Sequence, residues 1–364
     1  MKHPYHRSVL SCLRSLSLAL LIVTAFSAQA QENGARPEKP AKLFSNNDTL
    51  QVTLTAPWRE LVLHTNYEGD YPAKLEYIDD NGNPVSLDLT VERRGVKRQQ
   101  LCRYPPIRLR FKKEEVKGTA FRGQESIKMV THCEKASRYQ QYYVTEMLIY
   151  RMYNLVTDYS FRVRPLEVNY VDSKNGHSDR PRFAFLIEDD SDVAKRNGLK
   201  KLVIPRVSPK RLDPKLGSEF AVFQYLIGNV DWAVVSGPDP EECCHNVKLI
   251  APRPLQDGDI IYPIPYDFDS SGLVNADYAA PPNGLGLSYV TQRLYRGFCS
   301  HNDTMEQARQ WILSKESEML SLIDDEPLLS SSKKRQANKY LDRGFKPLKD
   351  PEDFEKQLIQ KCRR

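Results

Sequence analysis

Asp231, Asn246 and the pair Asp267 and Asp269 have the residue types and the order that phosphoryl transfer needs. Asp231 follows an apolar run with helix-like spacing, Asn246 opens a strand-like run, and Asp267-x-Asp269 ends a second such run. A hairpin of the two runs would bring these groups together. One carboxylate would then orient or deprotonate a hydroxyl, while the Asn and another carboxylate would hold Mg²⁺. The alternative is a turn and a solvated loop, where Asp and Asn are common.

The N-terminus has the pattern of a secretory signal peptide. Lys2, Arg7 and Arg14 precede the apolar run 16–26, and Ala28-Gln29-Ala30 follows as a small-residue cleavage site. We expect cleavage near Ala30, followed by a flexible polar lead over residues 31–47. No later apolar run is long enough to cross a bilayer. The sequence therefore predicts an exported, periplasmic or extracellular protein without a transmembrane segment.

The charge of the chain gives no reason to expect a nucleic-acid partner. The formal net charge is +6, and the three basic residues of the leader are lost with it. The remaining basic residues are dispersed, and the densest group, at positions 93–98, suits either a phosphate or a solvated face.

Six cysteines follow the leader, and an even number in an oxidising compartment predicts disulfides. Six cysteines allow 15 connectivities, and the sequence does not choose among them. One plausible arrangement pairs Cys102 with Cys133 and lets the adjacent Cys243 and Cys244 reach the two C-terminal cysteines, Cys299 and Cys362. A metal site is the alternative, but the histidines lack zinc-type spacing around these cysteines.

Hydrophobic periodicity predicts an α+β protein. Alternating runs bounded by turn residues indicate a twisted antiparallel sheet in a β-rich N-terminal lobe over residues 48–190. Residues 191–364 form a more helical C-terminal lobe that carries the Asp/Asn/Asp motif and a helical tail. The strands are expected at 50–54, 61–64, 73–78, 85–91, 107–111, 126–130, 161–171 and 181–188, and the helices at 139–156, 220–227 and 304–322.

Several segments, in the right order, resemble the spore-coat kinase family CotH over about residues 87–273. The segment 92–95 (Glu-Arg-Arg-Gly) resembles the Arg-Gly stretch of the family, and 183–188 resembles its Gly-x-Tyr-x-x-x-Glu hinge segment. The segment 228–232 (Gly-Asn-Val-Asp-Trp) resembles Gly-Asn-x-Asp-Arg, and 265–269 (Pro-Tyr-Asp-Phe-Asp) resembles Pro-Trp-Asp-x-Asp. The resemblance implies a two-lobed, protein-kinase-like fold and an atypical, secreted kinase that uses ATP and Mg²⁺ or Mn²⁺.

The resemblance also implies roles for the motif residues. Asp231 would face the acceptor hydroxyl, on a protein or another hydroxyl-bearing substrate. Asn246 and Asp267 would hold the metal, and Asp269 would take a second metal or brace the loop.

Further roles fall on residues of the N-terminal lobe. Lys128 would contact phosphate, with Arg94 as the alternative, and Glu146 would pair with either of them. The other interpretations are a solvated strand lysine and a glutamate on a helix surface. Glu188 would lie near the nucleotide base.

The chain also departs from the family pattern. Val96 and Lys97 replace the usual Ser-Ser, Trp232 replaces the usual Arg, and residues 236–244 form an insertion. ATP is also scarce outside the cytoplasm. Two alternatives therefore stand beside the kinase: a catalytically inactive module that binds a polymer, a partner protein or Ca²⁺, and nucleotidyl transfer with the same metal clamp.

Overall fold

Seven strands close into a barrel in the order β1-β2-β3-β4-β5-β7-β6. They are β1 (Leu50–Ala56), β2 (Tyr71–Ile78), β3 (Pro84–Arg93), β4 (Ile107–Phe111), β5 (Ser126–Val130), β6 (Val163–Asp172) and β7 (Arg182–Ile187). Neighbouring strands are antiparallel, as predicted, except that β1 pairs with β6 in parallel and closes the barrel. Local alternation predicts the strands of a twisted antiparallel sheet, but not the long-range parallel pair that closes it into a barrel.

The computed structural model describes residues 39–63, 69–95, 97–178 and 180–364. The predicted signal peptide, the first part of the predicted lead and Val96 lie outside these residues. Residues Arg36–Arg364 form one compact unit, and all features described below belong to it.

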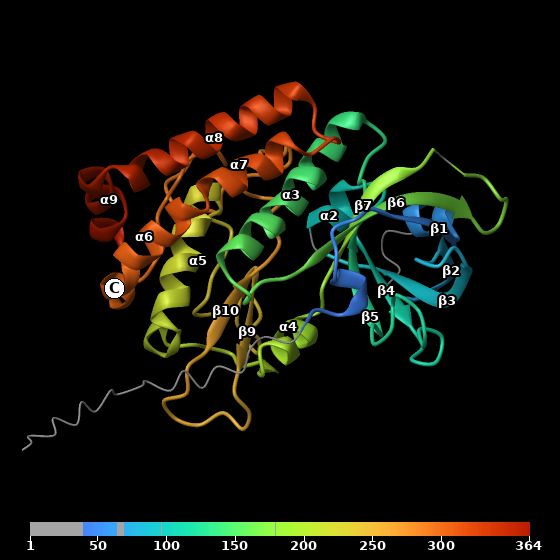
Figure 1. The fold of residues 1–364 in the computed structure, drawn as a ribbon, viewed down its shortest axis with the longest axis horizontal. Coiled ribbons are helices and arrows are strands. Elements are labelled where there is room, and N and C mark those ends of the chain that lie inside the picture. Colours follow the sequence, from blue (N-terminus) through green and yellow to red (C-terminus); the bar gives the residue numbers. More distant parts are fainter. Residues whose placement is uncertain (1–38, 64–68, 96, 179) are drawn as a thin grey trace, which may run out of the picture. The chain divides into compact units, whose positions relative to one another are not determined.

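Two hydrophobic cores fill this unit. One lies within the barrel and includes Leu54, Leu75, Val91 and Leu109, which alternate with outward-facing residues along their strands. The other surrounds helix α3 (Ser137–Val156) and extends into the C-terminal helices. Helix α3 contacts β6 and β7 on one side and α5 and α7 on another, so it lies where the two cores meet (Figure 1).

The remaining elements are helical apart from one small sheet of β8 (Lys200–Leu202), β9 (Val247–Ala251) and β10 (Tyr262–Pro265). The longer helices besides α3 are α5 (Pro214–Ile227), α6 (Met305–Ser314), α7 (Glu316–Asp324) and α8 (Ser331–Lys349). The short helices are α1 (Trp58–Leu63), α2 (Lys97–Leu101), α4 (Asp190–Arg196) and α9 (Pro351–Gln357). Within the described residues the α+β class is confirmed, and none of the helices is long and apolar enough to cross a membrane.

Two predicted elements were wrong. The strand expected at 61–64 is the end of α1, with His64 outside the described residues, because a short apolar run does not distinguish strand from helix. The helix expected at 304–322 is two helices, α6 and α7, which are separated at Lys315. The other predicted strands and helices are confirmed to within about two residues at each end, except that α5 begins at Pro214, six residues before the predicted start of that helix.

The disulfides confirm one predicted pairing and correct the other. Cys102 bonds to Cys133 as expected, whereas Cys243 bonds to its neighbour Cys244 and Cys299 bonds to Cys362. The last two pairings were wrong in the prediction because sequence spacing does not show which cysteines approach in the fold. The six cysteines that follow the predicted leader are all oxidised, which is compatible with an oxidising compartment.

The stretch 228–272 is closed at its two ends by a pair of glycines. The Gly272 N–H donates to the Gly228 carbonyl oxygen at 3.0 Å. Gly228 ends α5 in the left-handed conformation, with φ 64°, as predicted for a residue just past a helix. A Cβ at Gly228 or Gly272 would stand 1.9 or 2.1 Å from the hydroxyl oxygen of Tyr340. Because neither glycine has a side chain, the two ends of the stretch approach each other beside Tyr340 of α8.

We expect Gly228→Ala to lower the free energy of unfolding by about 2–4 kcal/mol, because it combines a left-handed Ala with overpacking against Tyr340. Gly258→Ala is the matched control, since Gly258 also has positive φ (88°) but no heavy atom within 4 Å of the position that a Cβ would take. It should cost only about 1–2 kcal/mol. Urea denaturation measures both values, and equal losses would show that Tyr340 does not restrict position 228.

Candidate active site

The β9–β10 hairpin brings Asp231, Asn246 and Asp267 together, as the sequence predicted. Val247 pairs with Pro265 across the hairpin, so Asn246 and Tyr266 lie side by side, and the Tyr266 N–H donates to the Asn246 carbonyl oxygen at 3.1 Å. The Asn246 side-chain Nδ2 donates to the Asp231 carbonyl oxygen at 2.7 Å. The charge of Asp231 also acts on Asp269. We call Asp231, Asn246, Asp267 and Asp269 the hairpin cluster.

Two members of the hairpin cluster have an uncommon backbone conformation. Asn246 has φ 51° and Asp267 has φ 60°, and these are two of the four non-glycine residues with positive φ in the described part of the chain. Asn and Asp tolerate this region better than other residues, but it remains unfavourable. Such residues concentrate at functional sites, where the surrounding structure holds them.

Arg98 on α2 lies at the centre of the carboxylates. Its Nη2 contacts Asp267 Oδ1 at 2.9 Å, its Nε contacts Asp269 Oδ2 at 3.2 Å, and its Nη1 contacts Glu146 Oε2 at 3.1 Å. The Arg98 side chain is 6% exposed and Glu146 on α3 is fully buried. The expectation that Glu146 pairs with Lys128 or Arg94, or lies on a helix surface, was therefore wrong.

One guanidinium does not fully compensate three carboxylates. Burial raises the pKa of Glu146 to about 8, although Arg98 acts in the opposite direction. Burial likewise raises the pKa of Asp269, and Asp267 adds to this effect by repulsion. Burial disfavours the charge of Arg98, but the three carboxylates outweigh it and hold its pKa well above the ordinary value. Arg98 thus stays charged, and the three carboxylates around it, those of Glu146, Asp267 and Asp269, favour an additional proton or cation.

Tyrosine hydroxyls complete the polar contacts of the two aspartates. Tyr150 on α3 accepts the Asp267 N–H at 2.8 Å, and burial raises the pKa of Tyr150, so its hydroxyl remains protonated. Tyr278 donates to Asp269 Oδ2 at 3.3 Å, and Ser270 donates to Asp269 Oδ1 at 3.2 Å. Both oxygens of Asp269 therefore have partners within the protein. Both predicted roles of Asp269, a second metal ligand or a brace for the loop, stay predictions.

Lys128 and Arg94 lie beside the cluster on the barrel side. Lys128 is 9% exposed, and its Nζ lies 5.1 Å from the centroid of the Tyr266 ring, next to Asp267. Burial, together with repulsion by Arg94 and Lys248, lowers the pKa of Lys128 to about 8. Burial also lowers the pKa of Arg94, against the attraction of Asp267. Lys128 is therefore not a solvated strand lysine, and an anion here would relieve the repulsion between the cations.

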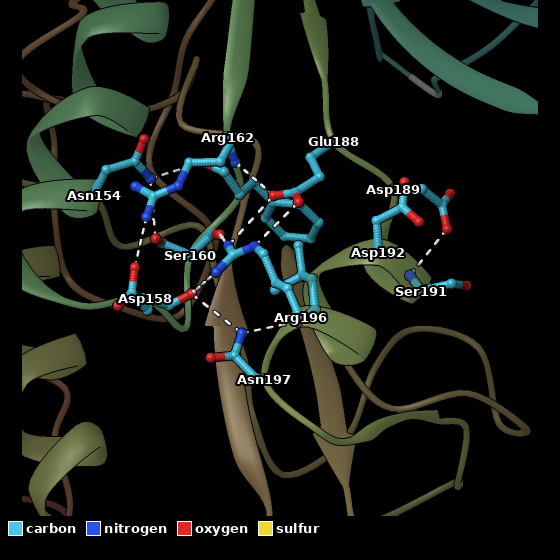
Figure 2. Close-up of polar contacts among 12 residues, drawn as sticks. Asn154, Asp158, Ser160, Arg162, Glu188, Asp189, Ser191, Asp192, Arg196 and Asn197 are labelled. Atoms are coloured by element: carbon cyan, nitrogen blue, oxygen red, sulfur yellow. Dashed lines mark hydrogen bonds and ion pairs between the residues drawn. The ribbon is translucent and has the colours of Figure 1, made fainter. Parts of the chain in front are cut away.

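Glu188 belongs to a separate network. Its Oε1 pairs with Arg196 Nε at 3.1 Å, its Oε2 accepts the Arg162 N–H at 2.9 Å, and the side chain is fully buried. Figure 2 shows the Glu188 carboxylate turned toward Arg196, which also donates to the backbone oxygens of Asp158 and Ser160. These contacts join α4 to the chain before β6. In the described residues no contact links Glu188 to the hairpin cluster, and its place beside a nucleotide base stays a prediction.

His245 is a site residue that the sequence alone did not single out. Its Nε2 lies 2.8 Å from Asp231 Oδ1, and the backbones of His245 and Ala233 exchange two hydrogen bonds. Asp231 therefore faces a histidine that directly precedes Asn246. A His before an Asn-led strand was visible in the sequence, but only the fold places its ring on Asp231. Arg98 was likewise visible only as part of a basic run.

The donor atoms fit a small oxygen-preferring cation in part. Mg²⁺ in nucleotide sites takes one or two carboxylates together with phosphate oxygens. Asp267, whose side chain is 34% exposed, and the Asn246 amide oxygen are suitable donors, whereas Asp269 is occupied by Arg98 and two hydroxyls. Among the residues that the structure describes, no group of three or more His, Cys, Asp and Glu is arranged to hold a metal by itself. Asp267 and Asn246 would thus hold a metal only together with a ligand that brings its own oxygens.

No protein-family model, curated protein or solved structure matches the chain. Function is therefore inferred from the geometry of the hairpin cluster and its basic neighbours.

We expect Arg98→Met to lower the free energy of unfolding by about 3–5 kcal/mol at neutral pH, because it removes the cation that pairs with the buried Glu146 and Asp269 and with the partly exposed Asp267. Arg110→Met is the matched control, since Arg110 pairs with Glu92 at 2.6 Å but is 45% exposed. Loss of that surface pair should cost less than about 1 kcal/mol. Chemical denaturation of both variants tests this, and a small loss for Arg98→Met would contradict its central role.

Proposed function

We propose that this protein is an exported, two-lobed, kinase-like phosphotransferase that moves a phosphoryl group from a metal-bound nucleotide to a hydroxyl acceptor on a protein. The barrel would form one lobe and the C-terminal helices with the β9–β10 hairpin the other. The three disulfides support a site of action outside the cytoplasm.

The observation that carries the proposal is that one carboxylate, in the loop after α5, approaches an amide and a second carboxylate that flank the β9–β10 hairpin, with cations on the barrel side. Asp231 is linked to Asn246 by the 2.7 Å bond, and Asp267 follows the strand that pairs beside Asn246. Lys128 and Arg94 from the barrel side act electrostatically on each other, and Arg94 also acts on Asp267. A phosphate chain needs both features: oxygen donors for its metal and cations for its charge.

Each residue of the site has its own role in the proposed phosphoryl transfer. Asp231 accepts the proton of the attacking hydroxyl as the new oxygen–phosphorus bond forms and the bond from phosphorus to the nucleotide oxygen breaks. The His245 ring, with Nε2 protonated, holds Asp231 Oδ1 in place. Lys128 and Arg94 bind phosphate oxygens, and Arg94 offers a planar fork for two of them. Mg²⁺ held by Asp267 and Asn246 would neutralise negative charge on the phosphates.

A second candidate function is a binding module without catalysis. The observation that favours it is the Arg98 guanidinium, which already compensates Asp267 and Asp269 at 2.9 and 3.2 Å. A chain that had lost its metal would keep its fold by such an internal cation. The two candidates differ in whether nucleotide binding depends on a divalent metal.

We expect the purified, oxidised protein to bind ATP in the presence of Mg²⁺ or Mn²⁺, and Asp267→Asn to lose at least about tenfold in affinity because it removes a charged metal ligand. Asp269→Asn is the matched control, since Asp269 makes the same kind of ion pair with Arg98 but has no oxygen left for a metal. It should keep its affinity within about threefold. Titration calorimetry with and without metal measures these values.

Equal losses in the two variants would assign the effect to Arg98 instead of a metal. Absence of ATP binding by the folded wild-type protein would reject the kinase and leave the binding module.

Lys128 makes ATP affinity depend on pH. Its pKa is lowered to about 8, so it is charged below this pH and neutral above it, whereas an ordinary lysine stays charged to about pH 10. We expect affinity for ATP to fall about tenfold between about pH 7.5 and pH 9.5, where the phosphates are ionised throughout. Lys128→Arg stays charged over this range and should flatten the profile. A wild-type profile as flat as that of the variant would remove Lys128 from the phosphate site.

A further inference from the structure

The loop that carries Asp231 is held by side chains and not by regular secondary structure. Residues 229–232 lie between α5 and the bridge at Ala233 and belong to neither helix nor strand. All four carbonyl oxygens of this loop accept a side-chain donor. Trp232 Nε1 donates to the carbonyl oxygen of residue 229 at 3.0 Å, and Asn246 Nδ2 donates to that of residue 231 at 2.7 Å. Arg296 Nη1 donates to the carbonyl oxygen of residue 230 and, at 2.6 Å, to that of residue 232.

Arg296 supplies two of these four contacts and comes from a segment far along the chain. Its Nη1 binds the carbonyl oxygens on either side of Asp231, and its guanidinium lies 4.9 Å from the centroid of the Trp232 ring. Burial lowers the pKa of Arg296, whereas the negative charge of Asp231 acts in the opposite direction. Arg296 thus fixes the backbone of residues 230–232 and places a cation near Asp231.

The segment that carries Arg296 is itself anchored to the C-terminus. The Arg363 N–H donates to the Gly297 carbonyl oxygen at 2.8 Å, and the Cys299 N–H donates to the Arg363 carbonyl oxygen at 2.9 Å. The disulfide between Cys299 and Cys362 joins the same two segments covalently. The Arg363 guanidinium lies 4.4 Å from the Phe298 ring and 5.4 Å from the Trp232 ring. The segment that carries Arg296 is therefore fixed to the C-terminus by two hydrogen bonds and a disulfide.

We propose that Arg296 is a positioning residue that aims the Asp231 carboxylate at the acceptor by holding the carbonyl groups on both sides of it. The inference rests on the proposed function, in which Asp231 takes the proton of the acceptor. The contacts of Arg296 lie on the Asp231 loop and not on Asp267, Lys128 or Arg94. Loss of Arg296 should therefore impair the chemical step and leave nucleotide binding in place.

Arg293 provides a matched control in the same segment. It also donates to two backbone carbonyl oxygens, those of Tyr340 at 2.6 Å and Leu226 at 3.1 Å, and it also lies over an aromatic ring, 3.8 Å from the centroid of Tyr340. Its contacts, however, join α5 to α8 and do not touch the Asp231 loop. Arg296→Met and Arg293→Met therefore remove equivalent interactions from the same segment.

The experiment measures single-turnover hydrolysis of ATP, with water as the acceptor, and ATP affinity by calorimetry in the wild type and both variants. For Arg296→Met we expect the rate to fall about a hundredfold, since a small misplacement of a catalytic group has this effect, with ATP affinity within about threefold. Arg296→Lys should recover part of the rate. Arg293→Met should keep its rate per folded molecule within about threefold. Hydrogen exchange of residues 229–232 should become faster only when Arg296 is replaced.

Three outcomes would count against the inference, and they are distinguishable. If both variants lose activity only in proportion to their loss of folded protein, Arg296 is a structural residue. If Arg296→Met leaves rate and exchange unchanged in an active protein, Arg296 does not position Asp231. If the wild type neither binds nor hydrolyses ATP, the proposed function fails, and the positioning role fails with it.

Discussion

The ion pairs of Arg98 are the interaction on which the arrangement of this protein depends. A single guanidinium on α2 contacts Glu146 on α3 and the two aspartates that follow β10. These elements belong to the region where the barrel core and the helical core meet. Buried ions are costly unless their partners are well placed, so the Arg98 contacts specify how the three elements meet.

The carboxylates around Arg98 outnumber its single positive charge. Three carboxylates share this cation, and burial, which Arg98 offsets only in part, raises the pKa of Glu146 to about 8. Such a site takes up a proton or a further cation more readily than a balanced pair does. A metal ion that arrives with a nucleotide would bring positive charge to these carboxylates. This links the structural role of Arg98 to the proposed function.

The conformation of the stretch 228–272 is imposed from outside it. Tyr340 lies over its two terminal glycines, Tyr150 binds the Asp267 N–H, and Arg296 holds the carbonyl groups around Asp231. Asn246 and Asp267 keep a left-handed backbone within this frame. The unfavourable local conformation is therefore maintained by contacts with α3, with α8 and with the segment before the C-terminal disulfide.

The sequence by itself determined the local features: most strands and helices, the glycine that ends α5, and the hairpin that joins Asn246 to Asp267. These follow from side-chain periodicity and backbone preferences, which act over a few residues. Only the fold shows that β1 pairs with β6, that Glu146 meets Arg98, that His245 contacts Asp231, and that Arg296 holds the carbonyl groups on either side of Asp231. Each of these joins groups that are far apart in the sequence or on different elements, so their approach depends on chain closure and on the packing of other elements. Residue type shows what such a group is able to bind, and only the fold shows which partner comes within reach.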